Sequence, residues 1–131
     1  FVLADPLLIA ALRDVLGAWT VSGPARHAVA AAFADRAWQA ASRERLGADG
    51  ERLAALLRAH GFAVRATPLF SWTDDPRAAA LHAALAARGI WTRYFPTPSS
   101  VRIGLPGSEA EWRRLGDALA HCAPLLQRAS A

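Results

Sequence analysis

Residues 89–106, GIWTRYFPTPSSVRIGLP, predict a β-hairpin around which the rest of the chain is organised. Two segments with alternating apolar residues, 90–95 and 100–105, flank a turn made of proline, threonine and serine. Each segment carries one arginine, Arg93 in the first and Arg102 in the second. A guanidinium held on a strand can bind a carboxylate or a phosphate through parallel hydrogen bonds. The alternative is that both arginines lie on the solvated face of an antiparallel sheet, and the hairpin alone leaves it open.

Two more strands and two helices are predicted on either side of this hairpin. Residues 62–67 and 69–73 are short runs with strand-like alternation. Asp75 followed by proline predicts a helix that ends near residue 88. Ser108 with Glu111 three residues later is a capping box, which marks the start of a last helix. We therefore expect a small, mostly antiparallel sheet with helices on one face, an α+β fold.

The first half of the chain is predicted to be helical. Two helices at about residues 6–16 and 24–33 each begin at a proline, which is favoured in the first helical turn. A longer helix is expected from residue 36 to about residue 60. The chain should therefore comprise a helical segment, residues 1–34, and a small α+β domain, residues 35–131.

The long helix is predicted to have a weak point in its middle. Gly47 and Gly50 each lower the stability of the helix by about 1 kcal/mol relative to alanine. They would allow a kink or a break near Ala48. Trp38, Leu53 and Leu57 are expected on its apolar side.

The composition excludes several classes of protein. A hydrophobic content of 53% with 20% charged residues is typical of a globular protein and not of a disordered one. No apolar run approaches the ~20 residues of a membrane span, and no signal peptide is visible, so we expect no membrane partner. The single cysteine, Cys122, excludes an internal disulfide and favours a cytoplasmic location. The four histidines are dispersed, and we predict no metal site.

All basic residues of the chain are arginine, which bears on both its partners and its chemistry. The net charge is +4, but the 15 arginines are interspersed with acids as on ordinary solvated helices, so we expect no nucleic-acid partner. Without any lysine, the chain cannot form a lysine Schiff base. It also lacks methionine, and we expect it to be a fragment of a longer protein.

Four short motifs, taken in order, carry a family resemblance over essentially the whole chain. They are FVLADP at residues 1–6, VSGP at 21–24, GIWTRYF at 89–95 and VRIGLP at 101–106. Together they resemble the C-terminal, small domain of fold-type I pyridoxal-phosphate enzymes of aminotransferase class I/II. Within these enzymes the chain resembles the histidinol-phosphate aminotransferase branch, and most of all the threonine-phosphate decarboxylases of cobalamin biosynthesis. The resemblance implies a lyase that removes CO2 from a phosphorylated amino acid or, alternatively, an aminotransferase.

The resemblance implies roles for both hairpin arginines. Arg102 matches the arginine that binds the α-carboxylate of the substrate, and Arg93 matches a strand arginine that could hold the substrate phosphate. Fixing the carboxylate decides which bond at Cα lies perpendicular to the cofactor ring, and so which bond breaks. The implied partners are a phosphorylated amino acid and, in the full-length protein, a second copy of the chain.

The family's Schiff-base lysine and its other cofactor contacts would precede residue 1. Pyridoxal phosphate is therefore expected in the parent enzyme, while this chain alone should hold no catalytic residue, bind no cofactor and be inactive. A non-enzymatic α+β module for an anion or a partner protein is the remaining alternative. It would use an exposed cluster of Trp91, Tyr94 and Phe95 beside the two arginines.

Overall fold

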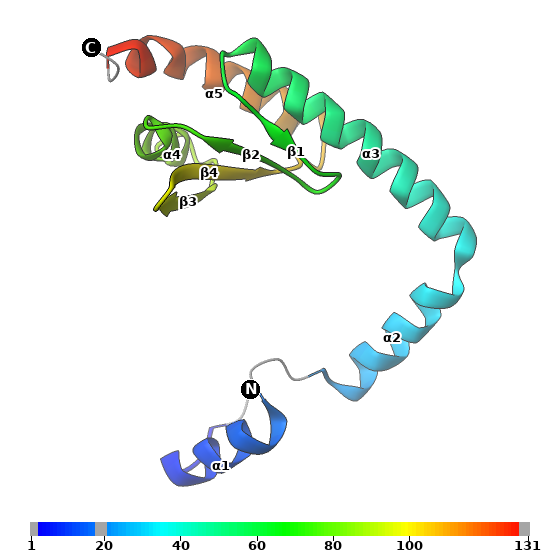
Figure 1. The fold of residues 1–131 in the computed structure, drawn as a ribbon. Helices are drawn as coiled ribbons and strands as arrows, with labels where there is room; N and C mark the ends of the chain where they lie inside the picture. Colours follow the sequence, from blue (N-terminus) through cyan, green and yellow to red (C-terminus); the bar gives the residue numbers. More distant parts are fainter. Residues whose placement is uncertain (1–2, 18–20, 129–131) are drawn as a thin grey trace. The chain divides into compact units, whose positions relative to one another are not determined.

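The computed structural model describes residues 3–17 and 21–128. Along the chain, these residues form α1 (Pro6–Leu16), α2 (Gly23–Ala34), α3 (Arg36–Ala59), β1 (Arg65–Ala66), β2 (Phe70–Asp74), α4 (Ala78–Ala86), β3 (Arg93–Pro96), β4 (Ser99–Gly104) and α5 (Glu109–Arg128), as labelled in Figure 1. Internal contacts divide the chain into two units, Phe1–Ala40 and Ala41–Ala131. The domain boundary predicted after residue 34 stays a prediction.

The two helices of the first unit have capped N-termini but no buried core. The backbone N–H of Leu7 donates to Asp5 Oδ1 over 2.8 Å at the start of α1, and Ala25 N–H donates to Ser22 Oγ over 3.4 Å at the start of α2. Both helices also have proline in the first turn, as predicted. Neither contains a buried residue, and Phe33 at the end of α2 is exposed.

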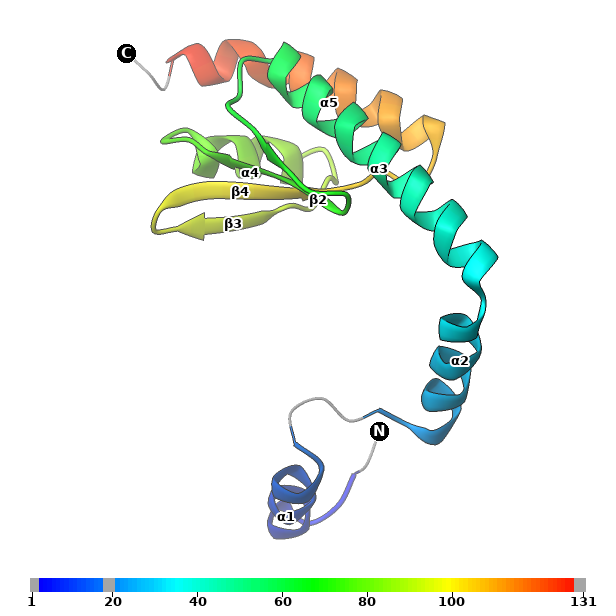
Figure 2. The same cartoon turned by 45° about the vertical axis from the view of Figure 1, so that its right-hand side comes forward.

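The second unit is an antiparallel sheet with three helices over one face. The strand order is β1-β2-β4-β3, and each neighbouring pair is antiparallel. Helices α3 and α5 run side by side across the same face of the sheet, as the views in Figures 1 and 2 agree. Helix α4 joins them in one core, whose buried residues are Leu53, Leu57, Phe62, Ala78, Leu81, Leu85, Val101, Ile103, Trp112, Leu115, Ala118, Leu119 and Cys122. The predicted α+β fold is confirmed.

Helix α3 continues through its glycines without a break. Gly50 is buried where the helix passes the turn before β2, and a Cβ there would lie 2.9 Å from the carbonyl oxygen of Thr67. This close approach of two backbones requires glycine and explains why the weak point is tolerated. Leu53 and Leu57 are fully buried as predicted, but Trp38 is 58% exposed, so its predicted place on the buried side is wrong.

Only residues 65 and 66 of the strand predicted at residues 62–67 form a strand, because the chain just before them terminates α3, which ends at Ala59. Gly61 has φ +82°, which favours glycine, and Phe62 N–H donates to the carbonyl of Leu57 over 3.3 Å. Phe62 is thereby drawn into the core, and only Arg65 and Ala66 remain to pair with β2. The alternation of apolar residues in this segment reflects helix termination followed by a short strand.

Helix α4 begins two residues later than Asp75-Pro76 predicted. The Asp75 carboxylate accepts the backbone N–H of Arg77 over 2.8 Å, and the Asp75 carbonyl accepts that of Ala78 over 2.9 Å. These bonds form a turn ahead of the helix.

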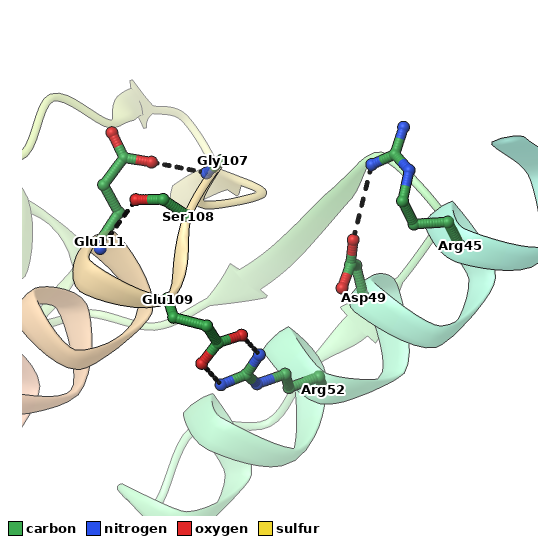
Figure 3. A network of polar contacts seen from close by, with 7 residues as sticks. All are labelled: Arg45, Asp49, Arg52, Gly107, Ser108, Glu109 and Glu111. Atoms are coloured by element: carbon green, nitrogen blue, oxygen red, sulfur yellow. Dashed lines mark hydrogen bonds and ion pairs between the residues drawn. The ribbon is translucent and has the colours of Figure 1, made fainter.

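The predicted capping box is present at the start of α5 (Figure 3). Glu111 N–H donates to Ser108 Oγ over 3.3 Å, and the Glu111 carboxylate accepts the N–H of Gly107 over 2.7 Å. These bonds satisfy backbone donors that have no partner within the helix.

An arginine of α3 ties the two long helices together beside this cap. Both carboxylate oxygens of Glu109 accept hydrogen bonds from Arg52, and Figure 3 shows this paired geometry. The hydrogen bonds from Arg52 lower the pKa of Glu109. The Arg52 guanidinium also lies over the ring of Trp112, 4.3 Å from its centroid. The contact fixes α3 against the first turn of α5.

Candidate functional site

The sheet register assembles a row of cationic and aromatic side chains on the face away from the helices. Arg65 of β1 pairs with Trp72 of β2, Trp72 pairs with Arg102 of β4, and Arg102 pairs with Arg93 of β3. Directly opposite residues of antiparallel strands project to the same side. The row therefore crosses all strands of this sheet, while Val101 on the other face is buried in the core.

Arg102 is the central member of this row. Its side chain is half-buried, and its Cζ lies over the ring of Phe70, 4.5 Å from the centroid. Its guanidinium makes no hydrogen bond or ion pair with the residues that the structure describes. An open pocket of about 450 Å³ adjoins it, lined by Arg65, Thr67, Phe70, Trp72 and Arg102.

Arg93 lies at the edge of the same row and is exposed. Its Cζ is 5.3 Å from the ring centroid of Phe95, and Phe95 in turn stacks on Trp72 at 4.7 Å with an interplanar angle of 25°. Like Arg102, Arg93 has no acidic partner among the described residues. The structure thus brings the two predicted arginines together on one face.

The acid on this face is already engaged. Asp74 accepts a hydrogen bond from Trp72 Nε1 over 2.7 Å, and its other oxygen pairs with Arg65. Arg93 and Arg102 therefore stand opposite each other without a counter-ion among the described residues. Like charges at directly paired positions repel, and an anion bound between or beside them would relieve that repulsion.

Sequence reasoning missed most of the aromatic surroundings of this site. Phe70 and Trp72 come from β2, and only the pairing of residues 70–74 with residues 100–104 places them beside Arg102. The alternation in residues 69–73 was the available signal, but it does not state which strand is the neighbour.

The predicted cluster of Trp91, Tyr94 and Phe95 is wrong. Tyr94 and Phe95 project to opposite faces of β3, and Tyr94 packs against the core. Trp91 is 83% exposed and contacts His82, with ring centroids 5.3 Å apart. Of the three, only Phe95 belongs to the face that carries the arginines.

Two further pockets, of about 280 Å³ and 550 Å³, border α5 and contain neither Arg93 nor Arg102. The larger one is also lined by arginines, Arg88, Arg113 and Arg114, but Asp117 lies among them. No group of His, Cys, Asp or Glu in the described residues could hold a metal ion. Within residues 3–17 and 21–128, no helix combines the length and hydropathy needed to cross a membrane. Since the chain has no lysine, no residue here can hold pyridoxal phosphate through a Schiff base.

The model of the family "Aminotransferase class I and II" matches residues 1–119. This chain belongs to that family. The resemblance seen in the four short motifs is thereby confirmed, and it extends over the helical first unit as well as the sheet.

Named relatives refine the place of the chain within the family. It is 50% identical over 120 residues to a threonine-phosphate decarboxylase of Pseudomonas aeruginosa, covering 91% of this chain and 36% of that protein. It is 35% identical over 128 residues to a histidinol-phosphate aminotransferase of Burkholderia mallei, again covering 91% of this chain and 36% of that protein.

A crystal structure from Burkholderia pseudomallei, assigned as an aminotransferase, superposes with a TM-score of 0.66. It is 26% identical and covers 89% of this chain and 37% of that one. The chain therefore spans about a third of the length of these family members.

Proposed function

We propose that this chain is the C-terminal, substrate-binding part of a pyridoxal-phosphate-dependent decarboxylase that acts on threonine phosphate. The proposal takes the reaction from the relative with 50% identity, and the role of this part from the open face of the sheet. We place the enzyme in the cytoplasm and expect the full-length protein to be a homodimer.

One observation carries the binding role: Arg93 and Arg102 are directly paired on adjacent strands, on one face, with no acid to neutralise them among the described residues. A substrate with a carboxylate and a phosphate offers two anionic groups, which matches two cations held side by side. A neutral partner would leave their repulsion in place.

In the proposed mode, Arg102 binds the carboxylate and Arg93 binds the phosphate. The planar guanidinium of Arg102 can donate two parallel hydrogen bonds, which fixes the carboxylate in direction as well as in position. Arg93 is more exposed and suits the doubly charged end of the substrate. With both ends fixed, rotation about the Cα bonds is restricted, and the bond to the carboxylate can be kept in the orientation that favours its cleavage.

Pyridoxal phosphate supplies the electron sink for this chemistry when it is bound. The residues of this chain do not fit a covalent site for it, because there is no lysine. Their proposed part is to bind and orient the substrate. Alone, the chain is expected to turn over nothing.

Titration calorimetry of the chain with O-phospho-L-threonine tests the binding role. Arg102→Ala should weaken binding by about tenfold to a hundredfold, as expected for hydrogen bonds to a charged group of roughly 1.5–3 kcal/mol. Arg102→Lys should fall between the alanine variant and the wild type, because it keeps the charge and loses the planar fork.

The matched control is Arg113→Ala, which removes the same charge from an exposed position on α5. It should leave the affinity unchanged. If Arg113→Ala weakens binding as much as Arg102→Ala, attraction by overall charge explains the result and the proposed site is wrong. Titration with L-threonine and with inorganic phosphate separates the two arginines, since Arg93→Ala should affect phosphate more than threonine.

A histidinol-phosphate-type aminotransferase is the second candidate, favoured by the relatives with 34–35% identity over 128 residues. Histidinol phosphate is the phosphate monoester of an amino alcohol and has no carboxylate, so both arginines would then serve the phosphate. Binding of L-histidinol phosphate with an affinity above that of O-phospho-L-threonine would favour this candidate.

A further inference from the structure

We infer that Phe70 is a positioning residue that holds the guanidinium of Arg102 ready for an anion. The inference rests on the proposed role of Arg102, and it assigns the second strand of the site, β2, a part in binding. Phe70 itself need not touch the substrate.

The contact between Phe70 and Arg102 depends on a glycine, Gly104, opposite the ring. Phe70 pairs directly with Gly104, so no side chain stands opposite its ring on β4. A Cβ added at Gly104 would have no atom within 4 Å, which shows that the space beside Phe70 is open. Arg102 lies two residues before Gly104 on the same face and reaches diagonally across to the ring, where its Cζ is 4.5 Å from the centroid.

Two of the three other arginines that lie over rings in the described part of the chain differ from Arg102 because each has an acidic partner. Arg52 lies over Trp112 and also pairs with Glu109, and Arg77 lies over Phe62 and also pairs with Asp75. In both cases the acid accepts two hydrogen bonds from the guanidinium and neutralises its charge, so the contact is structural. The third, Arg93, lies 5.3 Å from the Phe95 ring centroid, also without an acid among the described residues, but it is more exposed than Arg102 and farther from its ring. Arg102 has a ring and no acid among the described residues, so it is held in place while its N–H groups stay free for a ligand.

Holding the side chain in this way favours binding through entropy. A long side chain immobilised by a ligand loses rotamer freedom, which weakens association. Attraction to the face of the ring restricts the guanidinium beforehand and does not consume its hydrogen-bond donors. Phe70 is 39% exposed, so its replacement should have a modest effect on folding.

The first test needs no ligand. In a ¹H–¹⁵N spectrum, the Nε–Hε signal of Arg102, identified by its loss in Arg102→Lys, should carry an upfield ring-current shift from Phe70. Phe70→Leu should remove that shift and lower the ¹⁵N heteronuclear NOE of the side chain. Phe70→Tyr should preserve both, because the ring is retained. Trp91→Leu, which removes an exposed aromatic that contacts His82, is the matched control and should change neither.

The second test measures O-phospho-L-threonine binding to the same variants. Phe70→Leu should weaken it by about fivefold, with Phe70→Tyr close to the wild type and similar thermal midpoints for all. An Arg102 signal that does not move in Phe70→Leu, or unchanged affinity when it does move, would overturn the inference. If the wild-type chain does not bind the ligand, the proposed function fails, and the spectra alone decide whether Phe70 holds Arg102.

Discussion

Asp75 and Arg77 form a paired interaction that makes the stability of the sheet domain depend on pH. Asp75 is 9% exposed, and its two oxygens accept hydrogen bonds from Arg77 Nε at 2.8 Å and Arg77 Nη2 at 2.6 Å. These hydrogen bonds lower the pKa of Asp75 below its ordinary value and outweigh the opposing effect of burial. The pair closes the turn that leads into α4.

We predict that Arg77→Met lowers the unfolding free energy by about 1–3 kcal/mol at neutral pH, as for other charge-assisted hydrogen bonds. Because the folded-state pKa of Asp75 is depressed, its contribution is complete above the unfolded value of about 4 and is lost as the pH falls through the lower folded value. The difference between wild type and Arg77→Met should therefore shrink below about pH 4.

Urea unfolding over a pH series measures this difference. The pKa of Glu109 is lowered as well, but the substitution leaves that pair intact, so its effect cancels in the comparison. The contact of Arg77 with the Phe62 ring is lost at every pH and sets the residual difference. If the difference in unfolding free energy between wild type and Arg77→Met stays constant as the pH falls below about 4, Asp75 does not titrate with the predicted sign.

At this scale the sequence could predict the site only in part. Alternation placed Arg102 opposite to the core residues Val101 and Ile103, and the family resemblance suggested its ligand. The sequence could not predict Phe70 as the neighbour of Arg102. The two residues lie 32 positions apart in the chain, and they meet diagonally across adjacent strands. Such contacts depend on register, which the alternation of one strand does not determine.

At the scale of elements, the two glycines of α3 are predicted to respond in opposite directions to alanine. Gly47→Ala should raise the unfolding free energy by about 0.5–1 kcal/mol, because a Cβ there meets no atom within 4 Å and alanine favours the helix. Gly50→Ala should lower it by about 1–3 kcal/mol, because its Cβ would lie 2.9 Å from Thr67 O and 3.1 Å from Pro68 Cα. Chemical denaturation of the two variants gives both values, and stabilisation by both would mean that α3 does not approach the turn this closely.

The boundaries of elements were predictable where a local signal defines them. Ser108 with Glu111 predicts the start of α5 because both capping bonds join residues close in sequence. The strand expected at residues 62–67 shortened because Phe62 closes α3 instead of extending the sheet. Two local patterns, helix termination and strand alternation, compete there, and the core that Phe62 enters decides between them.

For the molecule as a whole, burial is divided unequally between the two units. Within the part of the chain that the structure describes, the hydrophobic core lies entirely in Ala41–Ala131. Helices α1 and α2 have 11 and 12 residues and no buried side chain, so their stability rests on caps and intrinsic helix propensity. Helices of this length without tertiary packing are marginal in water.

Hydrogen exchange of the intact chain should therefore separate the units. The amides of α1 and α2 should exchange at rates close to those of an unfolded peptide, whereas those of β4, between β2 and β3, should exchange slowly through global unfolding. Mass spectrometry of peptides from each element measures both, and a concentration series serves as the control. Slow exchange in α1 or α2 at every concentration would contradict the prediction. Protection that rises with concentration would show that their exposed apolar side chains associate between copies, since only packing could stabilise such short helices.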